Sequence, residues 1–325
     1  MKLLLGILAT CALLLATACG SGSSKSSSPT QPAAPPTESP VKLDLSKDDL
    51  GRAVGATAAP YKRIVAMSPT VVELMYQVGA TPIGRPNSAD FPAQAKSLPD
   101  FGTAYNPNFE VIASMKPDLI IADAIIDQPV IDSLSKLGAP VFALKIASFD
   151  DVVRGLRVVG ALSGNQSAGD AEAGKLTAKL TDIKSKLPAT GPSVIVLVSA
   201  GPGQFIAEKD DSYLGDILKK MNAKNVVAST DPENFRFPGF SDYSKERILE
   251  KNPDVIIAVS IGGPPGTPST ADQVKSDSAL STLSAVKNNR VYEVDPFVYV
   301  QSAGPRLNLI LDELPRLLYP TVFKS

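Results

Sequence analysis

The sequence predicts an α/β fold with two lobes, each built around a central parallel sheet, that are joined by a single long α-helix. Two observations lead to this prediction. From Tyr61 onward, short runs of β-branched and apolar residues alternate with longer segments that have helical spacing, which is typical of parallel α/β folds. One long amphipathic segment, residues 166–187, separates two such sets of runs. The fold class therefore follows from periodicity before any motif is considered.

The candidate strands form one set before residue 150 and another after residue 190. Several are continuous apolar runs, as expected of strands that are covered on both faces. After the first strand, Ser68 and Pro69 predict a helix start, with serine as the N-cap and proline in the first turn, and Gly79 predicts its end. The strands of the two sets are Arg63–Met67, Pro82–Gly84, Leu119–Ala122 and Val141–Leu144, then Val194–Val198, Asn225–Ala228, Val255–Val259 and Val291–Val294.

The segment from Gln166 to Leu187 predicts one long helix, because apolar residues recur on one side of it among Lys, Glu and Asp residues. At 1.5 Å per residue its length is about 33 Å. Pro188 and Pro192, with Gly191 between them, end it. A helix of this length is either a crossover within one sheet or a rigid connection between two lobes.

A repeated motif favours the connection between lobes. Residues 108–121 and 244–257 each have an N-capping residue, then a glutamate (Glu110 or Glu246), an isoleucine, a Pro-Asp pair and an apolar strand at matching spacings. This shared frame indicates an internal duplication. We therefore expect two Rossmann-like lobes, residues 41–165 and 188–325, joined by the helix 166–187. A ligand cleft is expected where the strand ends of the two lobes face each other.

Residues 1–18 predict a secretory signal peptide. Lys2 precedes an apolar run from Leu3 to Leu15 that is too short to span a bilayer, and small residues lead to Cys19. This ending resembles a bacterial lipobox, so we expect a lipid on Cys19 that anchors an exported protein at the outer face of the cytoplasmic membrane, or in the periplasm of a diderm. The alternative is ordinary cleavage after Ala18, which leaves a free thiol. Residues 19–40 are rich in Ser and Pro and predict a disordered tether.

The composition excludes several kinds of active site. The chain has no histidine, so a Ser-His-Asp or Cys-His arrangement cannot form. Cys19 is the only cysteine outside the signal peptide, so neither a disulfide nor the usual zinc site is expected. Loss of Lys2 with the signal peptide leaves 31 basic and 33 acidic residues, a net charge of −2, and no basic tract for nucleic acid. We expect a protein that is not an enzyme, with no catalytic residue and no metal site of its own.

Short motifs follow one another in a fixed order from about Val41 to Pro320. Each is weak alone, but their order and spacing together are specific. They are Asp49-Leu-Gly-Arg52-Ala-Val54, Arg63-Ile-Val-Ala-Met-Ser-Pro69 with Glu73-Leu74 and Gly79, Asp90-Phe-Pro92, Glu110…Lys116-Pro-Asp118-Leu-Ile-Ile, Ser244-Lys-Glu246, Asn252-Pro-Asp254-Val-Ile-Ile and Gly304-Pro-Arg306. In these motifs the chain resembles the substrate-binding proteins of ABC importers for ferric siderophores, haem and cobalamin, whose two lobes are joined by a helical backbone.

This resemblance implies a role for the two repeated glutamates. In the family, a glutamate near the start of a helix in each lobe docks on arginines of the membrane-embedded permease, and by position these are Glu110 and Glu246. The alternative is that each carboxylate only supports its own helix, because the helix dipole favours negative charge in the first turn. The implied partners are a permease dimer with its ATPase and a small-molecule ligand. The protein itself is expected to be a monomer without a cofactor, although its ligand can contain Fe or Co.

The resemblance also implies a ligand, a ferric siderophore or a cobalamin-type molecule. Cobalamin-binding members line the cleft with large aromatic residues. This chain has Ser88 and Ala104 where two rings of the N-terminal lobe would lie, and it keeps Phe205 and Phe240 in the C-terminal lobe. The residues expected to line the cleft are Ser68, Asn87, Ser88, Ala104, Tyr105, Phe205, Phe237, Phe240 and Tyr299, with Phe235 and Phe297 as further aromatic surface nearby.

Two alternatives stay open at this point. Haem-binding relatives coordinate iron through His, Tyr or Met, so a haem receptor would have to use Tyr105, Tyr243, Tyr299 or Met67. A lipid-anchored sensor or structural protein with no transport role is the second alternative. A single rigid helix between the lobes also predicts that ligand binding closes them only modestly.

Overall fold

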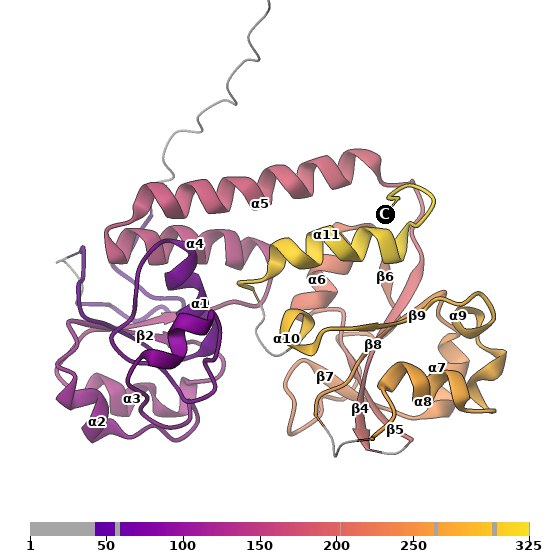
Figure 1. Ribbon diagram of the computed structural model, residues 1–325, viewed down its shortest axis with the longest axis horizontal. Helices are drawn as coiled ribbons and strands as arrows, with labels where there is room; N and C mark the ends of the chain where they lie inside the picture. Colours follow the sequence, from indigo (N-terminus) through magenta and orange to yellow (C-terminus); the bar gives the residue numbers. More distant parts are fainter. Residues whose placement is uncertain (1–42, 56–58, 202, 263–265, 301–303, 325) are drawn as a thin grey trace, which may run out of the picture. The chain divides into compact units, whose positions relative to one another are not determined.

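The computed structural model describes residues 43–55, 59–201, 203–262, 266–300 and 304–324 (Figure 1). The predicted signal peptide, Cys19 and the tether lie outside the described residues. Within the described ranges, no helix combines the length and the apolar character needed to cross a lipid bilayer. The described residues belong to one compact unit, Lys42–Ser325. We call residues 43–165 its N-terminal half and residues 188–324 its C-terminal half.

The N-terminal half contains a three-stranded parallel sheet in the order β1-β2-β3. Three of the four predicted strands form it. The fourth, Pro82–Gly84, is reduced to a single bridge between Gly84 and Val65, because Pro82 has no amide hydrogen to donate. The strands are β1 (Ile64–Ala66), β2 (Leu119–Asp123) and β3 (Val141–Leu144).

The C-terminal half contains a six-stranded sheet in the order β7-β5-β4-β8-β9, and the short β6 pairs with the beginning of β4. The predicted strands β4, β6, β8 and β9 are parallel. The sequence patterns do not predict β5 and β7. β5 runs antiparallel beside β4 after a turn at Gly203, where φ is 69°, and β7 runs antiparallel beside β5. The strands are β4 (Ser193–Gly201), β5 (Gln204–Glu208), β6 (Lys224–Asn225), β7 (Phe240–Tyr243), β8 (Val255–Val259) and β9 (Val291–Val294).

The predicted long helix is α5 (Gln166–Lys186). The preceding α4 (Phe149–Ser163) packs so closely against it that a Cβ on Gly169 would lie 2.5 Å from the carbonyl oxygen of Leu156. As predicted, Ser68 caps the first helix, since its side chain accepts from the amide of Val71. The other helices are α1 (Pro69–Gln77), α2 (Phe109–Ser114), α3 (Ile131–Ser135), α6 (Tyr213–Lys220), α7 (Lys245–Lys251), α8 (Thr270–Ser276), α9 (Ser284–Lys287), α10 (Pro296–Tyr299) and α11 (Leu307–Leu318), with 3₁₀ turns η1 (Ala93–Ser97), η2 (Gln128–Val130) and η3 (Leu280–Thr282).

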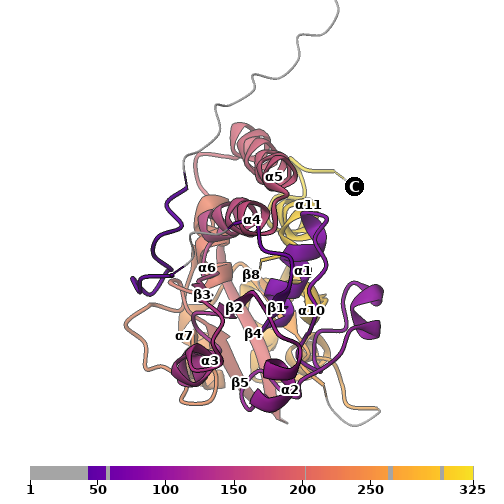
Figure 2. The same cartoon turned by 90° about the vertical axis from the view of Figure 1, so that its left-hand side faces the viewer.

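Alternating strand residues divide the hydrophobic core into three clusters. The inner cluster extends through both halves: it joins one face of each sheet with α1, α4, α5, α6, α10 and α11. A second cluster lies between the other face of the N-terminal sheet and helices α2 and α3. The third lies between the other face of the C-terminal sheet and helices α7, α8 and α9. Both views show α5 alongside α4, and α11 packs against α5 as well (Figures 1 and 2).

The two halves meet at more places than the predicted helix. The amide of Phe149, at the start of α4, donates to Asp216 of α6 at 2.9 Å, and Asp150 pairs with Lys220 at 2.8 Å. Arg306, just before α11, pairs with Glu73 of α1. The predicted helix α5 connects the two halves, and these further contacts join segments that are distant in the sequence, which periodicity does not reveal.

Candidate functional site

Exposed aromatic side chains are concentrated in a few segments between strands. Nine large apolar side chains of the described residues are exposed, and five are aromatic: Phe91, Tyr105, Phe235, Phe237 and Phe297, which we call the exposed aromatic set. Phe235 and Tyr105 are the most open, with 86% and 75% of their surface exposed. Both halves contribute, and Phe297 lies in α10, directly after β9. Exposed apolar groups of this size mark binding surfaces when they occur together.

The loop between β6 and β7 is built to hold Phe235 and Phe237 outward. Asn234 is buried beneath it, and its side-chain oxygen accepts from the amides of Arg236 (2.9 Å) and Phe237 (3.1 Å). Its amide nitrogen donates to Asp242 of β7 at 2.7 Å. These hydrogen bonds fix the backbone of the loop from below. The rings of Phe235 and Phe237 stay on the outer side, where they contact solvent or a ligand.

The structure separates the predicted residues of the N-terminal half into two groups. Asn87, Ser88 and Tyr105 are exposed, and a ligand can reach them. Ser68 is fully buried as the cap of α1, and Ala104 is 5% exposed. Ser68 and Ala104 are therefore buried beneath the surface and are not open to a ligand.

The predicted residues of the C-terminal half are also placed differently from one another. Phe237 is exposed and Phe240 is half-buried. Tyr299 is buried, and its hydroxyl donates to Glu313 of α11 at 2.9 Å, so its ring is part of the core and not of an open wall. Phe205 is buried in the cluster under α7 and α8, away from the inner cluster on which Phe240 packs.

A turn after β2 presents an apolar residue that the sequence analysis missed. The side chain of Asp123 accepts from the amides of Ile125 and Ile126, and the amide of Asp123 donates to Asp127 at 2.7 Å. Burial raises the pKa of both carboxyls, that of Asp127 to about 7. This turn leaves Ile125 exposed at the carboxyl end of a parallel strand, where α/β proteins bind ligands. Its only sequence signal is an apolar residue just after a strand.

Glu110 and Glu246 occupy equivalent positions. Each is the exposed second residue of a short helix, α2 or α7. Asn108 and Ser244 cap these helices by accepting from the third helical amide, at 3.1 and 3.3 Å. Hydrogen bonds from its own backbone amide and from Ser244 lower the pKa of Glu246, so this carboxylate is charged at neutral pH. The repeat thus places one negative side chain at the same point in each half.

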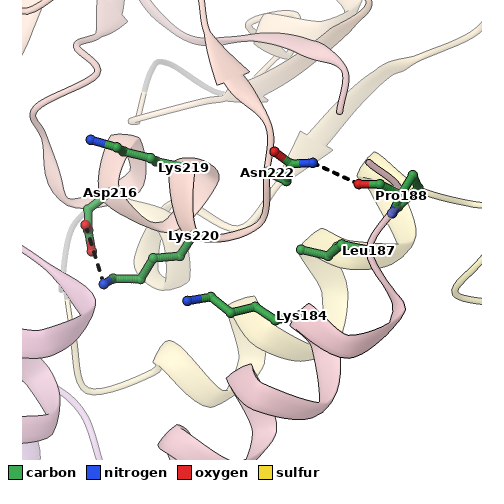
Figure 3. A pocket seen from close by; sticks show the side chains of 7 residues that line it. All are labelled: Lys184, Leu187, Pro188, Asp216, Lys219, Lys220 and Asn222. Atoms are coloured by element: carbon green, nitrogen blue, oxygen red, sulfur yellow. Dashed lines mark hydrogen bonds and ion pairs between the residues drawn. The ribbon is translucent and has the colours of Figure 1, made fainter. Parts of the chain in front are cut away.

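One of two cavities has a predicted ligand residue in its lining. A cavity of about 980 Å³ lies at the carboxyl ends of β4 and β8, and Phe205 and Lys245 are among its lining residues. A pocket of about 580 Å³ lies between the end of α5 and α6, and Figure 3 shows Lys220 pointing toward Asp216 beside it. None of the residues lining the second pocket is a predicted ligand residue. In the described part of the chain, no three His, Cys, Asp or Glu side chains gather so that they could hold a metal ion.

Comparison with known proteins gives the family. The family model described as periplasmic binding protein matches residues 64–297, well over half of the chain. The ABC transporter substrate-binding lipoprotein YvrC of Bacillus subtilis is 28% identical over 274 residues, 81% of this chain and 82% of the relative. The Fe(3+)-citrate-binding protein YfmC of the same organism is 27% identical over 251 residues, 75% and 76% of the two chains.

A solved structure supports the same fold. The periplasmic vitamin B12 binding protein BtuF of Vibrio cholerae superimposes with a TM-score of 0.67 at 20% identity, over 82% of this chain and 99% of that chain. Its fold has two lobes, as the sequence predicted for this chain. With the family match over residues 64–297, this chain is a member of the periplasmic binding protein family.

Proposed function

We propose that the chain is the extracytoplasmic substrate-binding component of an ABC importer, which captures a ferric-siderophore or cobalamin-type ligand and delivers it to the permease. The observation that carries the proposal is the exposed aromatic set. Aromatic rings supply large apolar contact area at low entropic cost, and binding sites for large organic ligands use them for that reason. Relatives that are named for binding Fe(3+)-citrate and vitamin B12 support this ligand class.

The ligand site lies between the two halves in this proposal. Of the predicted cleft residues, those that a ligand would contact are the ones that are not buried: Asn87, Ser88 and Tyr105 from the N-terminal half, and Phe237 and Phe240 from the C-terminal half.

A ligand that brings its own complete coordination shell fits better than haem. Of the four candidate iron ligands, Met67, Tyr243 and Tyr299 are at most 1% exposed, and the hydroxyl of Tyr299 is held by Glu313. Tyr105 alone is exposed. A haem bound here would depend on that one side chain, whereas a siderophore or corrinoid needs no metal ligand from the protein.

Location and partners complete the proposal. A lipid on Cys19 holds the protein at the membrane, and residues 19–40 are the tether. Residues 41–165 and 188–325 are the two lobes, and 166–187 the helix between them. Glu110 and Glu246 dock on a permease dimer that works with its ATPase. The protein releases its ligand unchanged and catalyses no reaction.

A thermal-shift screen tests the ligand class. The probes are a ferric catecholate, a ferric hydroxamate, ferric citrate, haemin and cyanocobalamin, each with its metal-free form where one exists. A ligand at 100 times its Kd stabilises the folded state by about 2.7 kcal/mol, which raises the Tm by several degrees. We expect such a shift from an iron complex or the corrinoid. If no probe shifts the Tm at a concentration 100 times a micromolar Kd, the proposal is contradicted. If haemin alone shifts the Tm, the protein is a haem receptor instead.

A further inference from the structure

Arg306 links the two halves through a buried ion pair. Its Nε and Nη2 each donate to one carboxylate oxygen of Glu73 in α1, and both distances are 2.9 Å. The side chain of Arg306 is 12% exposed and that of Glu73 is 3% exposed. A planar guanidinium matches a carboxylate with two parallel bonds, which a lysine cannot reproduce.

The residues just before Arg306 also contact the N-terminal half. The side-chain amide of Gln77, at the end of α1, donates to the carbonyl oxygen of Pro305. Gly304 has φ of 108°, and a Cβ there would lie 2.8 Å from Ile146 and 3.1 Å from Val152. The segment 304–306 therefore packs closely against α1, Ile146 and the start of α4.

Arg306 also contacts a member of the exposed aromatic set. Its guanidinium lies over the ring of Phe91, 4.0 Å from the ring centre. Phe91 stays half exposed and belongs to the same loop as Asn87 and Ser88. This loop is held from the other side by Arg85, which donates to the carbonyl oxygens of Pro86 (3.0 Å) and Asn87 (3.1 Å).

We propose that Arg306 is a positioning residue for the ligand site. Fixed by Glu73, it holds Phe91, and with it the loop that carries Asn87 and Ser88, at a set distance from the C-terminal half. Arg306 acts through these residues and does not itself touch the ligand. The ligand-binding part of this inference rests on the proposed function, whereas the spacing of the two halves does not.

Three variants separate positioning from simple stability. Arg306→Lys keeps the charge but loses the paired bonds. Phe91→Leu keeps the ion pair with Glu73 and removes the ring. The matched control is Asp312→Asn, which breaks the 2.6 Å ion pair between α11 and Lys179 of α5 and leaves the segment 304–306 intact.

The first measurement needs no ligand. Spin labels are attached at the exposed residues Gln94 and Lys287 of the full chain, with Cys11 and Cys19 changed to Ser, and the distance distribution between them is recorded by pulsed electron resonance. We expect one narrow distribution for the wild type and Asp312→Asn, and a distribution at least twice as wide for Arg306→Lys. Equal widths for Arg306→Lys and the wild type would overturn the inference.

The second measurement uses the probe that shifts the Tm in the screen. We expect the dissociation rate to rise at least tenfold in Arg306→Lys and three- to tenfold in Phe91→Leu, with no change in Asp312→Asn. A lower Tm in Arg306→Lys with an unchanged dissociation rate would reduce Arg306 to a stabilising residue and overturn the positioning role. If no probe binds the wild type, the proposed function fails, and the distance distribution alone decides whether Arg306 fixes the two halves.

Discussion

Phe205 and Phe240 lie on opposite faces of the C-terminal sheet. Phe205 pairs with Tyr243, and Phe240 pairs with Glu208, across the antiparallel strands β5 and β7. Side chains alternate between faces along a strand, so Phe205 points into the cluster under α7 and α8 while Phe240 packs on the inner cluster. The two rings therefore cannot line one wall of a ligand site, as the sequence analysis had them do.

Replacing these two residues with alanine is expected to give opposite results. Phe240→Ala should weaken ligand binding by about 1–3 kcal/mol, the range of a buried anchor in a binding site. Phe205→Ala should lower the free energy of unfolding by about 3–5 kcal/mol, because it opens a cavity in the core. Urea denaturation and ligand titration of both variants measure the two quantities. Weaker binding in Phe205→Ala without loss of stability would contradict this assignment.

Tyr299 is predicted to matter for stability and not for the ligand. Its pKa is raised by burial and by the nearby carboxylate of Glu313, so the hydroxyl keeps its proton and donates a hydrogen bond to Glu313. Tyr299→Phe should cost about 1.5–3 kcal/mol of stability, as expected for a hydrogen bond to a charged group, with unchanged ligand affinity. Phe297→Leu, on the exposed face of α10, is the control, and it should keep the wild-type stability.

Charge reversal at Glu110 and Glu246 tests permease docking. Glu110→Lys and Glu246→Lys should keep the wild-type ligand affinity and lose little stability, because each carboxylate supports only the first turn of its own helix. Uptake of the ligand by cells should fall strongly, because each change turns an attraction into a repulsion and slows association. Variants that are destabilised yet transport normally would show that the glutamates only support their helices.

The buried carboxyl of Glu208 is expected to give stability a specific pH dependence. Its Oε1 accepts from the amide of Leu214, its Oε2 has no hydrogen-bond partner among the described residues, and burial raises its pKa to about 7. The folded protein thus keeps a proton that the unfolded chain, with a glutamate pKa of about 4.3, has released. The contribution of Glu208 to the free energy of unfolding is largest below about pH 4.3. It falls as the pH rises toward 7 and is constant above that.

Glu208→Gln should remove this slope. The free energy of unfolding of Glu208→Gln minus that of the wild type should increase by about 2–3 kcal/mol between pH 4.5 and pH 8. Urea denaturation over this range measures it, with the exposed Glu233→Gln as the control. Parallel curves for the wild type and Glu208→Gln would show that the carboxyl titrates normally.

The duplicated motif was the most informative part of the sequence, and the structure explains why its residues recur. The carboxylate of Asp118 accepts from the amides of Lys62 and Arg63 at 2.8 Å, where the chain enters β1. Asp254 accepts from the amide of Ser193 at 2.9 Å, at the first residue of β4. Each Pro-Asp pair thus joins a strand to the start of its neighbour in the same sheet.

The site could be predicted less well than the fold. A strand that is buried on both faces is recognised from its apolar run, so β3 and β8 have the predicted bounds. The mixed sequences of β5 and β7 gave no such signal, and without these strands the face on which Phe205 lies could not be known. The ring of Phe91 packs against Arg306, which lies far away along the chain, and the hydroxyl of Tyr299 finds its acceptor, Glu313, in the next helix.

The inner cluster, shared by the two sheets, has a consequence for folding. Neither half can be separated from the other without exposing the apolar face that α4, α5 and α11 now cover. A melt of the protein should therefore show a single transition in which the calorimetric and van't Hoff enthalpies agree, and not one transition for each sheet. The duplication that produced two similar units has given a chain that folds as one, so a fragment that contains only one sheet should remain unfolded.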